Sequence, residues 1–358
     1  MMSAMVPEEQ QNIFKILRCM ARIRTAELYI AERYPEQNMR CPIHLCLGQE
    51  ATAAALGALV NQSDIFFGSY RAHGQYLAKG GNLTALFAEL LGRADGCSGG
   101  IGGSPHLMDR SCGFYGSTAI VGGHIPIAAG TALACKVRAK GEIAVCFLGD
   151  AAMEEGVMYD TVNCALLFKL PILFVCENNR QCVTTPIELR TTHKELYKRF
   201  EPMALPSARV DGTDMPALSR AAQEMLDVVR SGQGPAFLEC LVDRWAIHVG
   251  HTYEGPVDAW WQDPCAPEAE RCPIARAARM LISEGALRVP ELARLHSELR
   301  HEVEAAFVAA EKLPPPGPDI LQNGVYASGL VSSLPTAAGA VTGVTGAHDE
   351  PTKLVNPY

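Results

Sequence analysis

The sequence predicts an α/β protein, and the prediction rests mainly on residues 143–179. The run 143–148 is short, apolar and rich in β-formers, which is typical of a buried strand. A helical pattern follows at three- and four-residue steps, with Val157, Thr161, Ala165 and Phe168 on one face. Residues 172–176 then predict a second buried strand. The two strands and the helix form one unit, whose crossover is right-handed if both strands share a parallel sheet.

Polar residues stand just past the end of each predicted strand. Asp150 follows the first strand, and Asn178 and Asn179 follow the second. Because open α/β sheets bind ligands at this edge, a carboxylate and an amide oxygen can converge there, and such oxygens suit Mg²⁺. The backbone N–H groups of Ala151 and Ala152 begin the helix and are placed for a phosphate. On the spacing alone, an ordinary strand–helix–strand unit with polar strand ends is an equally good interpretation.

Composition narrows the class of protein. The 358 residues are 48% hydrophobic and 20% charged, enough for one large α/β domain or two smaller ones. The net charge of −8 without a dense basic run indicates no nucleic-acid partner. The longest apolar stretch, 119–135, is interrupted by glycine and proline, and the polar start lacks a signal-peptide core, so no membrane partner is expected. The thirteen cysteines are scattered and form no Cys-x-x-Cys pair, which favours buried free thiols in a reducing cytoplasm.

Further elements follow from the same patterns. We expect helices at 10–34, 51–59, 124–137, 215–229, 274–285 and 290–312, and strands at 64–68, 207–210 and 236–242. Residues 96–105 are too rich in glycine for regular structure, and no helix pattern follows them at the place a dinucleotide fingerprint requires. They predict a loop.

Four further motifs indicate a function for the polar residues at the strand ends. They are HLCLGQEA at 44–51, SYRAHG at 69–74, GGIGGSPHLMD at 99–109 and CENN at 176–179. With Asp150, they resemble the thiamine diphosphate signature, in which Gly-Asp-Gly is followed by a helix, a strand and Asn-Asn. The set is similar to the α chains of the first components of 2-oxo acid dehydrogenase complexes, a group that includes acetoin dehydrogenase α chains. The resemblance implies a thiamine diphosphate-binding fold with a mostly parallel sheet flanked by helices on both faces.

The resemblance runs from about residue 10 to about Ala327. It divides the chain into an N-terminal helical segment at 1–35, a cofactor-binding α/β domain with C-terminal helices at 36–327, and a tail at 328–358. The tail is rich in Gly, Ala, Ser and Thr, has no family counterpart and is expected to be flexible.

The resemblance also assigns the metal and the two ends of the cofactor. Asp150, Asn179 and the main-chain carbonyl of Gln181 would hold Mg²⁺. Tyr70 and Arg71 would grip the diphosphate, where a guanidinium fork makes a bidentate contact. The backbone at Ala119 and Val121 would receive the aminopyrimidine, and Ala151 and Ala152 would add N–H groups at the diphosphate. From the residues alone, Arg71 is equally well an isolated surface arginine.

Two histidines are the candidates for acid–base work. By resemblance, His44 lies near the reactive carbon of the cofactor, where it could donate to the substrate carbonyl. His248 follows Arg244 by four residues and would face the diphosphate and an incoming lipoyl group. Each also has a plain structural interpretation. His251 is an alternative to His248, and His106 is a weaker candidate beside the glycine-rich run.

The sequence departs from the family pattern at three places. Ala151 replaces a glycine, which would cost about 1 kcal/mol if the position needed a positive φ. We expect a negative φ, because the residue enters a helix. Residues 116–124 read GSTAIVGGH where the family has GGNGIVGAQ. Residues 249–254 replace Ser-x-Ser-Asp-Pro, so the phosphorylation loop of animal pyruvate dehydrogenases is absent.

The function implied is that of an α subunit. The enzyme would use thiamine diphosphate and Mg²⁺ to decarboxylate a 2-oxo acid, or to cleave acetoin, and would pass the acyl group to a lipoyl-bearing acyltransferase. The family takes the glutamate that activates the cofactor from a β chain, and this sequence offers no candidate. We therefore expect an α2β2 heterotetramer whose α chain alone is inactive. Two alternatives remain open: a lipoyl-independent carboligase subunit of a biosynthetic pathway, and a binding subunit that has lost the cofactor.

Overall fold

A six-stranded parallel sheet forms the centre of the computed structural model, which describes residues 8–318 and 320. The strand order is β2-β1-β3-β4-β8-β7, and every neighbouring pair runs parallel. The strands are β1 (Ile65–Gly68), β2 (Phe114–Ser117), β3 (Ala144–Gly149), β4 (Ile172–Asn178), β7 (Ser207–Asp211) and β8 (Ala236–Leu241). All seven residues of β4 are buried, as expected for a central strand covered on both faces.

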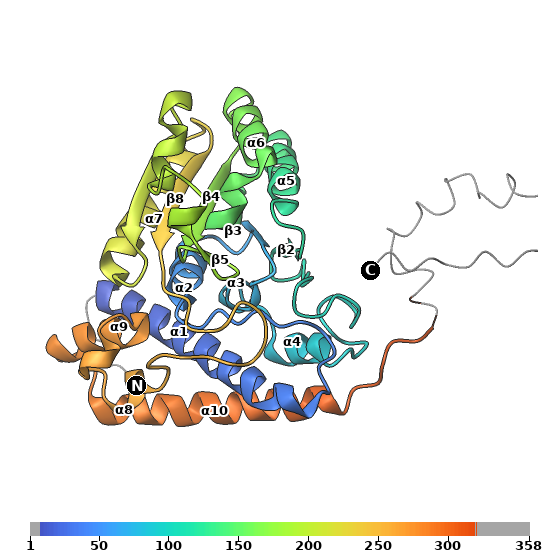
Figure 1. The fold of residues 1–358 in the computed structure, drawn as a ribbon, viewed down its shortest axis with the longest axis vertical. Coiled ribbons are helices and arrows are strands. Elements are labelled where there is room, and N and C mark those ends of the chain that lie inside the picture. Colours follow the sequence, from blue (N-terminus) through green and yellow to red (C-terminus); the bar gives the residue numbers. More distant parts are fainter. Residues whose placement is uncertain (1–7, 319, 321–358) are drawn as a thin grey trace, which may run out of the picture. The chain divides into compact units, whose positions relative to one another are not determined.

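Helices cover both faces of this sheet, which confirms the predicted fold class. Alternate residues of β3 point into two different cores, one on each face of the sheet. Val145 and Phe147 belong to one core, and Cys146 and Leu148 belong to the other. Figure 1 shows α7 on one side of the sheet and α5 and α6 on the other. The helices are α1 (Glu8–Arg33), α2 (Glu50–Leu59), α3 (His73–Ala78), α4 (Leu83–Leu90), α5 (His124–Arg138), α6 (Gly156–Leu167), α7 (Met215–Arg230), α8 (Ala259–Gln262), α9 (Pro273–Ser283) and α10 (Val289–Glu311).

The long first and last helices lie side by side. In Figure 1, α1 and α10 run along the same edge of the molecule, far apart in sequence but adjacent in space. Leu17 and Met20 of α1 and Leu299 and Val303 of α10 belong to the same buried core, as their predicted apolar stripes require.

The predicted helices and strands are all present, within a few residues at each end. The structure adds four short elements that the sequence patterns did not predict: α3, α4, α8 and the edge strand β2. It also adds a small antiparallel hairpin, β5 (Gln181–Cys182) with β6 (Thr185–Pro186). The thirteen cysteines are free thiols, as predicted, although Cys164 and Cys265 are exposed rather than buried.

Two sequence-based expectations concern membrane-spanning helices and the C-terminal tail. No helix among residues 8–318 is both long and apolar enough to cross a bilayer. The predicted tail at 328–358 lies outside the described residues, and the domain boundaries stay predictions.

Candidate active site

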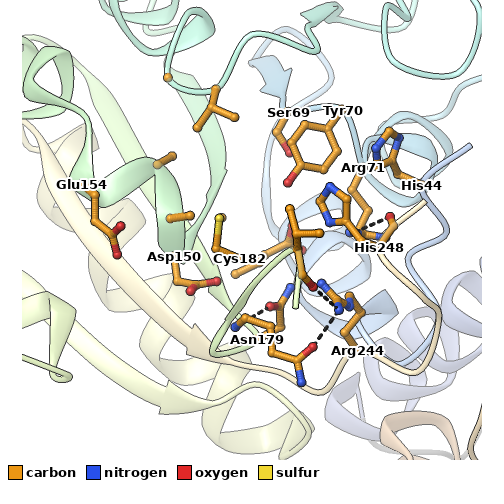
Figure 2. A pocket seen from close by; sticks show the side chains of 18 of the residues that line it. His44, Ser69, Tyr70, Arg71, Asp150, Glu154, Asn179, Cys182, Arg244 and His248 are labelled. Atoms are coloured by element: carbon orange, nitrogen blue, oxygen red, sulfur yellow. Dashed lines mark hydrogen bonds between the residues drawn. The ribbon is translucent and has the colours of Figure 1, made fainter. Parts of the chain in front are cut away.

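A cavity of about 370 Å³ opens where the carboxyl ends of the strands meet (Figure 2). The segment 69–71 follows β1, Asp150 follows β3, Asn179 follows β4, and Arg244 comes shortly after β8. The sheet order makes β1, β3, β4 and β8 consecutive neighbours, so these side chains reach one place. The cavity wall includes every main site residue that the resemblance assigns: His44, Tyr70, Arg71, Ala119, Val121, Asp150, Ala151, Ala152, Asn179, Gln181 and His248.

Asp150 and Asn179 supply oxygen atoms to the same cavity. Asp150 is buried and opens the short 3-10 helix Asp150–Glu154 directly after β3. The Asn179 Oδ1 atom accepts a hydrogen bond from the backbone N–H of Gln181 over 3.1 Å, which fixes the amide close to the end of β4. A carboxylate, an amide oxygen and a nearby main-chain carbonyl are the hard donors that Mg²⁺ prefers. The described residues contain no cluster of three His, Cys, Asp or Glu side chains for a softer metal.

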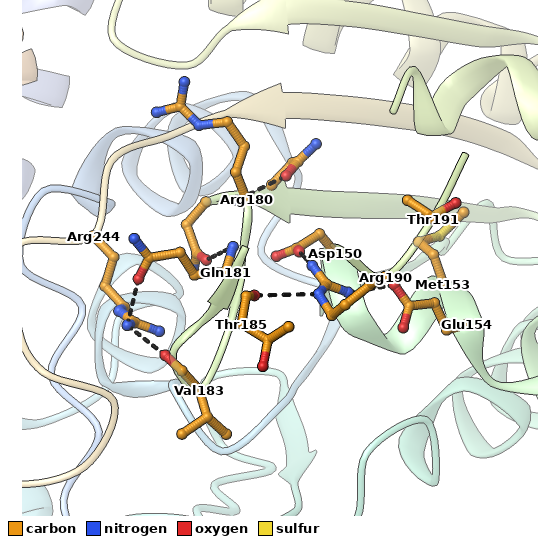
Figure 3. Close-up of polar contacts among 12 residues, drawn as sticks. Asp150, Met153, Glu154, Arg180, Gln181, Val183, Thr185, Arg190, Thr191 and Arg244 are labelled. Atoms are coloured by element: carbon orange, nitrogen blue, oxygen red, sulfur yellow. Dashed lines mark hydrogen bonds and ion pairs between the residues drawn. The ribbon is translucent and has the colours of Figure 1, made fainter. Parts of the chain in front are cut away.

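Arg190, which the sequence did not point to, pairs with the candidate metal ligand. Its guanidinium donates to the Oδ2 atom of Asp150 and also to Glu154 (Figure 3). Burial raises the pKa of Asp150, and the positive charge of Arg190 opposes that shift without cancelling it. The arginine thus provides a protein cation at the place where a metal cation would bind.

Two arginines line the side of the cavity assigned to the diphosphate. Arg71 is buried rather than on the surface; it donates to the backbone carbonyl of Leu45 and, over 3.2 Å, to that of His248. Arg244 donates to the Gln181 side chain over 2.6 Å and to the Val183 carbonyl over 2.7 Å (Figure 3). Its buried Nε atom has no partner among the described residues. Together they give this side of the cavity two guanidinium groups, a setting suited to an anion.

Three aromatic rings meet in the wall of the cavity (Figure 2). The centroid of the His44 ring lies 4.5 Å from Tyr70 and 5.2 Å from His248. Burial, with the nearby charge of Arg71, lowers the pKa of His44 to about 3 and that of His248 to about 4. Both imidazoles are therefore neutral at pH 7, and each has a buried Nδ1 atom without a partner in the described part of the chain. Neutral rings with unused nitrogens can accept or relay a proton.

The backbone at Ala151 has the predicted conformation. Ala151 lies in the 3-10 helix and is not one of the non-glycine residues with positive φ in the described ranges. The alanine therefore causes no backbone strain, which removes the reason to suspect a lost cofactor. Ala119 and Val121 line the cavity from an exposed segment, with Val121 42% exposed.

The two weaker histidine candidates do not reach the cavity. His251 lines a separate cavity next to α1 and α10, and His106 is exposed and is absent from the wall of the site. The alternative to His248 is therefore not supported by position. The structure instead adds residues that sequence reasoning missed: Gln49, Glu177, Arg190 and Arg244. Gln49, Glu177 and Arg244 lay inside recognised motifs, so a signal was available; Arg190 had none.

Glu177 is a buried carboxyl group in the cavity wall. Its Oε2 atom accepts a hydrogen bond from Gln75 over 2.7 Å. Burial raises the pKa of Glu177 to about 8, although the Gln75 bond and the charge of Arg71 work in the opposite direction. A carboxyl group of this kind is largely protonated at pH 7 and can donate a hydrogen bond.

Comparisons with known proteins identify the family to which the chain is similar. Residues 18–319 match the family model described as dehydrogenase E1 component. The chain is 34% identical over 310 residues to the pyruvate dehydrogenase E1 component subunit alpha, somatic form, of Homo sapiens, covering 86% of this chain and 78% of the relative. It is 35% identical to the same subunit of Bos taurus with the same coverage. It is 34% identical over 319 residues to the testis-specific form of Rattus norvegicus, covering 88% and 80% of the two chains.

Proposed function

The chain belongs to the dehydrogenase E1 component family, and we propose that it is the α subunit of a thiamine diphosphate- and Mg²⁺-dependent 2-oxo acid dehydrogenase or acetoin-cleaving enzyme. The subunit would transfer the acyl group to a lipoyl acceptor and would act only with a β subunit. One observation carries the proposal: the cavity at the strand ends gathers an acid, an amide, two arginines and two neutral histidines. An ordinary strand–helix–strand unit would not require this convergence.

The residues present fit the metal and the phosphate end of the cofactor. Asp150, Asn179 and the carbonyl of Gln181 would hold the Mg²⁺ ion. The N–H groups of Ala151 and Ala152 would meet the diphosphate at the start of the 3-10 helix. Tyr70, Arg71 and Arg244 line the facing wall and would supply a hydroxyl and two cations, and the Ala119–Val121 backbone would meet the aminopyrimidine. When bound, thiamine diphosphate supplies a carbon nucleophile for reaction at a carbonyl group.

The two histidines would handle protons in this site. Because His44 and His248 are neutral at pH 7, either ring can accept a hydrogen bond from one partner and donate one to another. His44 would hold a proton for the substrate oxygen, and His248 would serve the acyl-transfer step. The T-shaped contact between the two rings keeps both near the same reacting position.

The exposed surface supports a partner chain. α5 carries the large apolar residues Ile127, Leu133 and Val137, with exposures of 60%, 44% and 77%. Ile120, whose sequence neighbours line the cavity, is 68% exposed. Apolar side chains of this size in one region usually mark an interaction surface. A β subunit that covered this region could also bring the glutamate that the family takes from its β chain, which supports an α2β2 assembly.

We also propose a reducing, cytoplasmic location. The support is chemical: all thirteen cysteines are free thiols, and several are buried in the cores on either face of the sheet, including Cys146, Cys176 and Cys240.

The test is an assay of the reconstituted α/β pair with 2-oxo acids and acetoin, with and without a lipoyl-bearing acceptor. The proposal predicts product only when the β chain, thiamine diphosphate, Mg²⁺ and the lipoyl acceptor are all present. Product that forms equally well without lipoyl would instead support the carboligase alternative, which the altered segment 249–254 motivates. A Tyr159→Phe variant, changed in a residue outside the cavity wall, serves as the matched control and should keep full activity.

A further inference from the structure

We propose that Gln49 is a positioning residue that holds the Asn179 amide in place from its nitrogen side, so that the Asn179 oxygen stays toward the metal position, and that Gln49 presents its own N–H group to the diphosphate. The inference rests on the proposed function, because it concerns the same metal and cofactor. Gln49 belongs to the LGQEA motif at 47–51, to which that function gives no role. Its side chain is only 3% exposed and lines the cavity.

The orientation of the Asn179 amide follows from a fixed backbone donor. An asparagine can present either its oxygen or its nitrogen to a given point, and the choice depends on its neighbours. The Gln181 backbone N–H can only donate, so the atom it meets at 3.1 Å must be the Asn179 oxygen, Oδ1. The Asn179 nitrogen, Nδ2, then points the other way and meets Gln49 Oε1 at 3.2 Å. The oxygen keeps a second lone pair, which is available to a metal ion.

The same logic fixes the Gln49 amide. Because its Oε1 accepts from Asn179, its Nε2 must face away from Asn179. That nitrogen is buried and has no hydrogen-bond partner within the described residues. Buried donors almost always have partners, so an acceptor that enters the cavity is expected to satisfy it. Under the proposed function, the acceptor would be a phosphate oxygen of the cofactor, which Gln49 would help to hold.

The backbone around Gln49 is rigid enough to hold its side chain in this position. The Glu50 side chain accepts from the Gly48 N–H over 3.1 Å and pairs with Arg24, and both Glu50 and Arg24 are fully buried. Gly48 has a φ of +87°, and an added Cβ would lie 2.4 Å from the Asp243 carbonyl oxygen, so only glycine fits. The Gln49 N–H also donates to the Cys46 carbonyl over 2.9 Å. Outer-shell partners of metal ligands typically need such fixed support.

The experiment compares two substitutions that separate the two roles of the side chain. Gln49→Leu removes both the acceptor for Asn179 and the donor into the cavity. Gln49→Glu keeps an acceptor for Asn179 but replaces the donor with a carboxylate. Thr52→Val is the matched control, because Thr52 is a buried polar residue of α2 outside the cavity wall. Thiamine diphosphate binding to the α/β pair is measured by calorimetry over a series of Mg²⁺ concentrations, together with the melting temperature of the metal-free pair.

The expected results differ between the variants. Gln49→Leu should need roughly 10- to 100-fold more Mg²⁺ for half-maximal cofactor binding, the usual loss for an outer-shell partner. Gln49→Glu should need less extra Mg²⁺ but should bind thiamine diphosphate more weakly even when Mg²⁺ saturates, because its charge faces the phosphate. Thr52→Val should change neither quantity.

The outcomes also separate this inference from the proposed function. A wild-type pair that fails to bind thiamine diphosphate with Mg²⁺ would overturn the function and the inference together. A wild-type pair that binds, with an unchanged Mg²⁺ requirement in Gln49→Leu, would overturn the role of Gln49 alone. A lower melting temperature in both Gln49 variants without any change in Mg²⁺ requirement would likewise leave only a packing role.

Discussion

Arg190 holds two carboxylates at the edge of the candidate site. Its side chain is 8% exposed and that of Asp150 is 2% exposed, so this pair lies largely out of water. Charges in such surroundings must be compensated, and an unpaired buried carboxylate is costly. In the absence of a metal, Arg190 therefore supplies a positive charge that compensates the buried Asp150 carboxyl group.

We predict that Arg190→Gln destabilises the metal-free chain by roughly 3 kcal/mol at neutral pH, because it leaves a buried charge without its partner. Urea unfolding in the presence of EDTA measures this loss, and added Mg²⁺ should recover part of it. Arg18→Gln is the control: Arg18 pairs with Glu298 at the surface, where both side chains are more than half exposed, so the change should be much smaller. Equal stability of wild type and Arg190→Gln would contradict the account of this pair.

The histidine pair predicts a loss of stability toward acid. Folding lowers the pKa of His44 to about 3 and of His248 to about 4, whereas unfolded histidines titrate near pH 6.5. Between about pH 6.5 and pH 4 the unfolded chain binds more protons, so the free energy of unfolding falls as the pH falls through that window. A His44→Gln, His248→Gln double variant should lose less stability than wild type between pH 7 and pH 5 in urea unfolding. Identical losses would show that the two rings do not titrate in this way.

At this scale the sequence could identify the residues that stand in motifs and could not identify the rest. Asp150, Asn179 and His248 were predictable because chemistry and spacing mark them together. Arg190 was not, because it reaches Asp150 from a segment after β6 that carries no pattern of its own. The side-chain orientation of Asn179 also depends on Gln49, 130 residues earlier, and such pairing is invisible without the fold.

At the scale of elements, the glycine-rich run 96–105 is held more firmly than its composition predicts. The buried carboxylate of Glu89, in α4, accepts four backbone N–H groups from it. The donors are Ser98, Gly100, Gly102 and Gly103, at 2.7, 2.9, 2.7 and 3.0 Å. The run has no regular structure, as predicted, but one carboxylate serves as the partner for its backbone. Glycine fits because an added Cβ at Gly96 would lie 2.4 Å from the Glu89 carboxylate.

Glu89→Gln should release this loop, since an amide nitrogen cannot accept the N–H groups that one carboxylate oxygen now takes. We expect a loss of roughly 1–3 kcal/mol in the free energy of unfolding and much faster hydrogen exchange at residues 98–103. Hydrogen-exchange mass spectrometry gives the exchange rates, and Asp95→Asn, an exposed acid next to the loop, is the control. Unchanged protection in Glu89→Gln would contradict the role of the carboxylate.

Helices and strands were predictable where their apolar pattern extended over enough residues. The 26 residues of α1 and the buried β4 each carry a clear apolar pattern. The six residues of α3 and the four of β2 are too short to show a period above chance. α4 did carry a signal, because Asn82 caps it by accepting from the Ala85 N–H, and apolar residues recur through it.

At the scale of the whole molecule, the sheet order decides where the site lies. The order β2-β1-β3-β4-β8-β7 brings together strands whose ends carry Arg71, Asp150 and Asn179, and no local pattern encodes it. The sequence could give the neighbouring pair β3 and β4, because one crossover joins them. Side chains elsewhere on the surface remain apolar and exposed, notably along α5. Such residues usually mark an interaction surface, and the proposed β subunit would cover them.

The central claim is that the edge of this sheet binds thiamine diphosphate through a divalent ion. The most direct test is calorimetric titration of thiamine diphosphate into the α/β pair, wild type and Asp150→Asn, with Mg²⁺ or with EDTA. We predict saturable binding to wild type that requires Mg²⁺ and is lost in Asp150→Asn. Binding of equal strength in EDTA, or in Asp150→Asn, would contradict the claim.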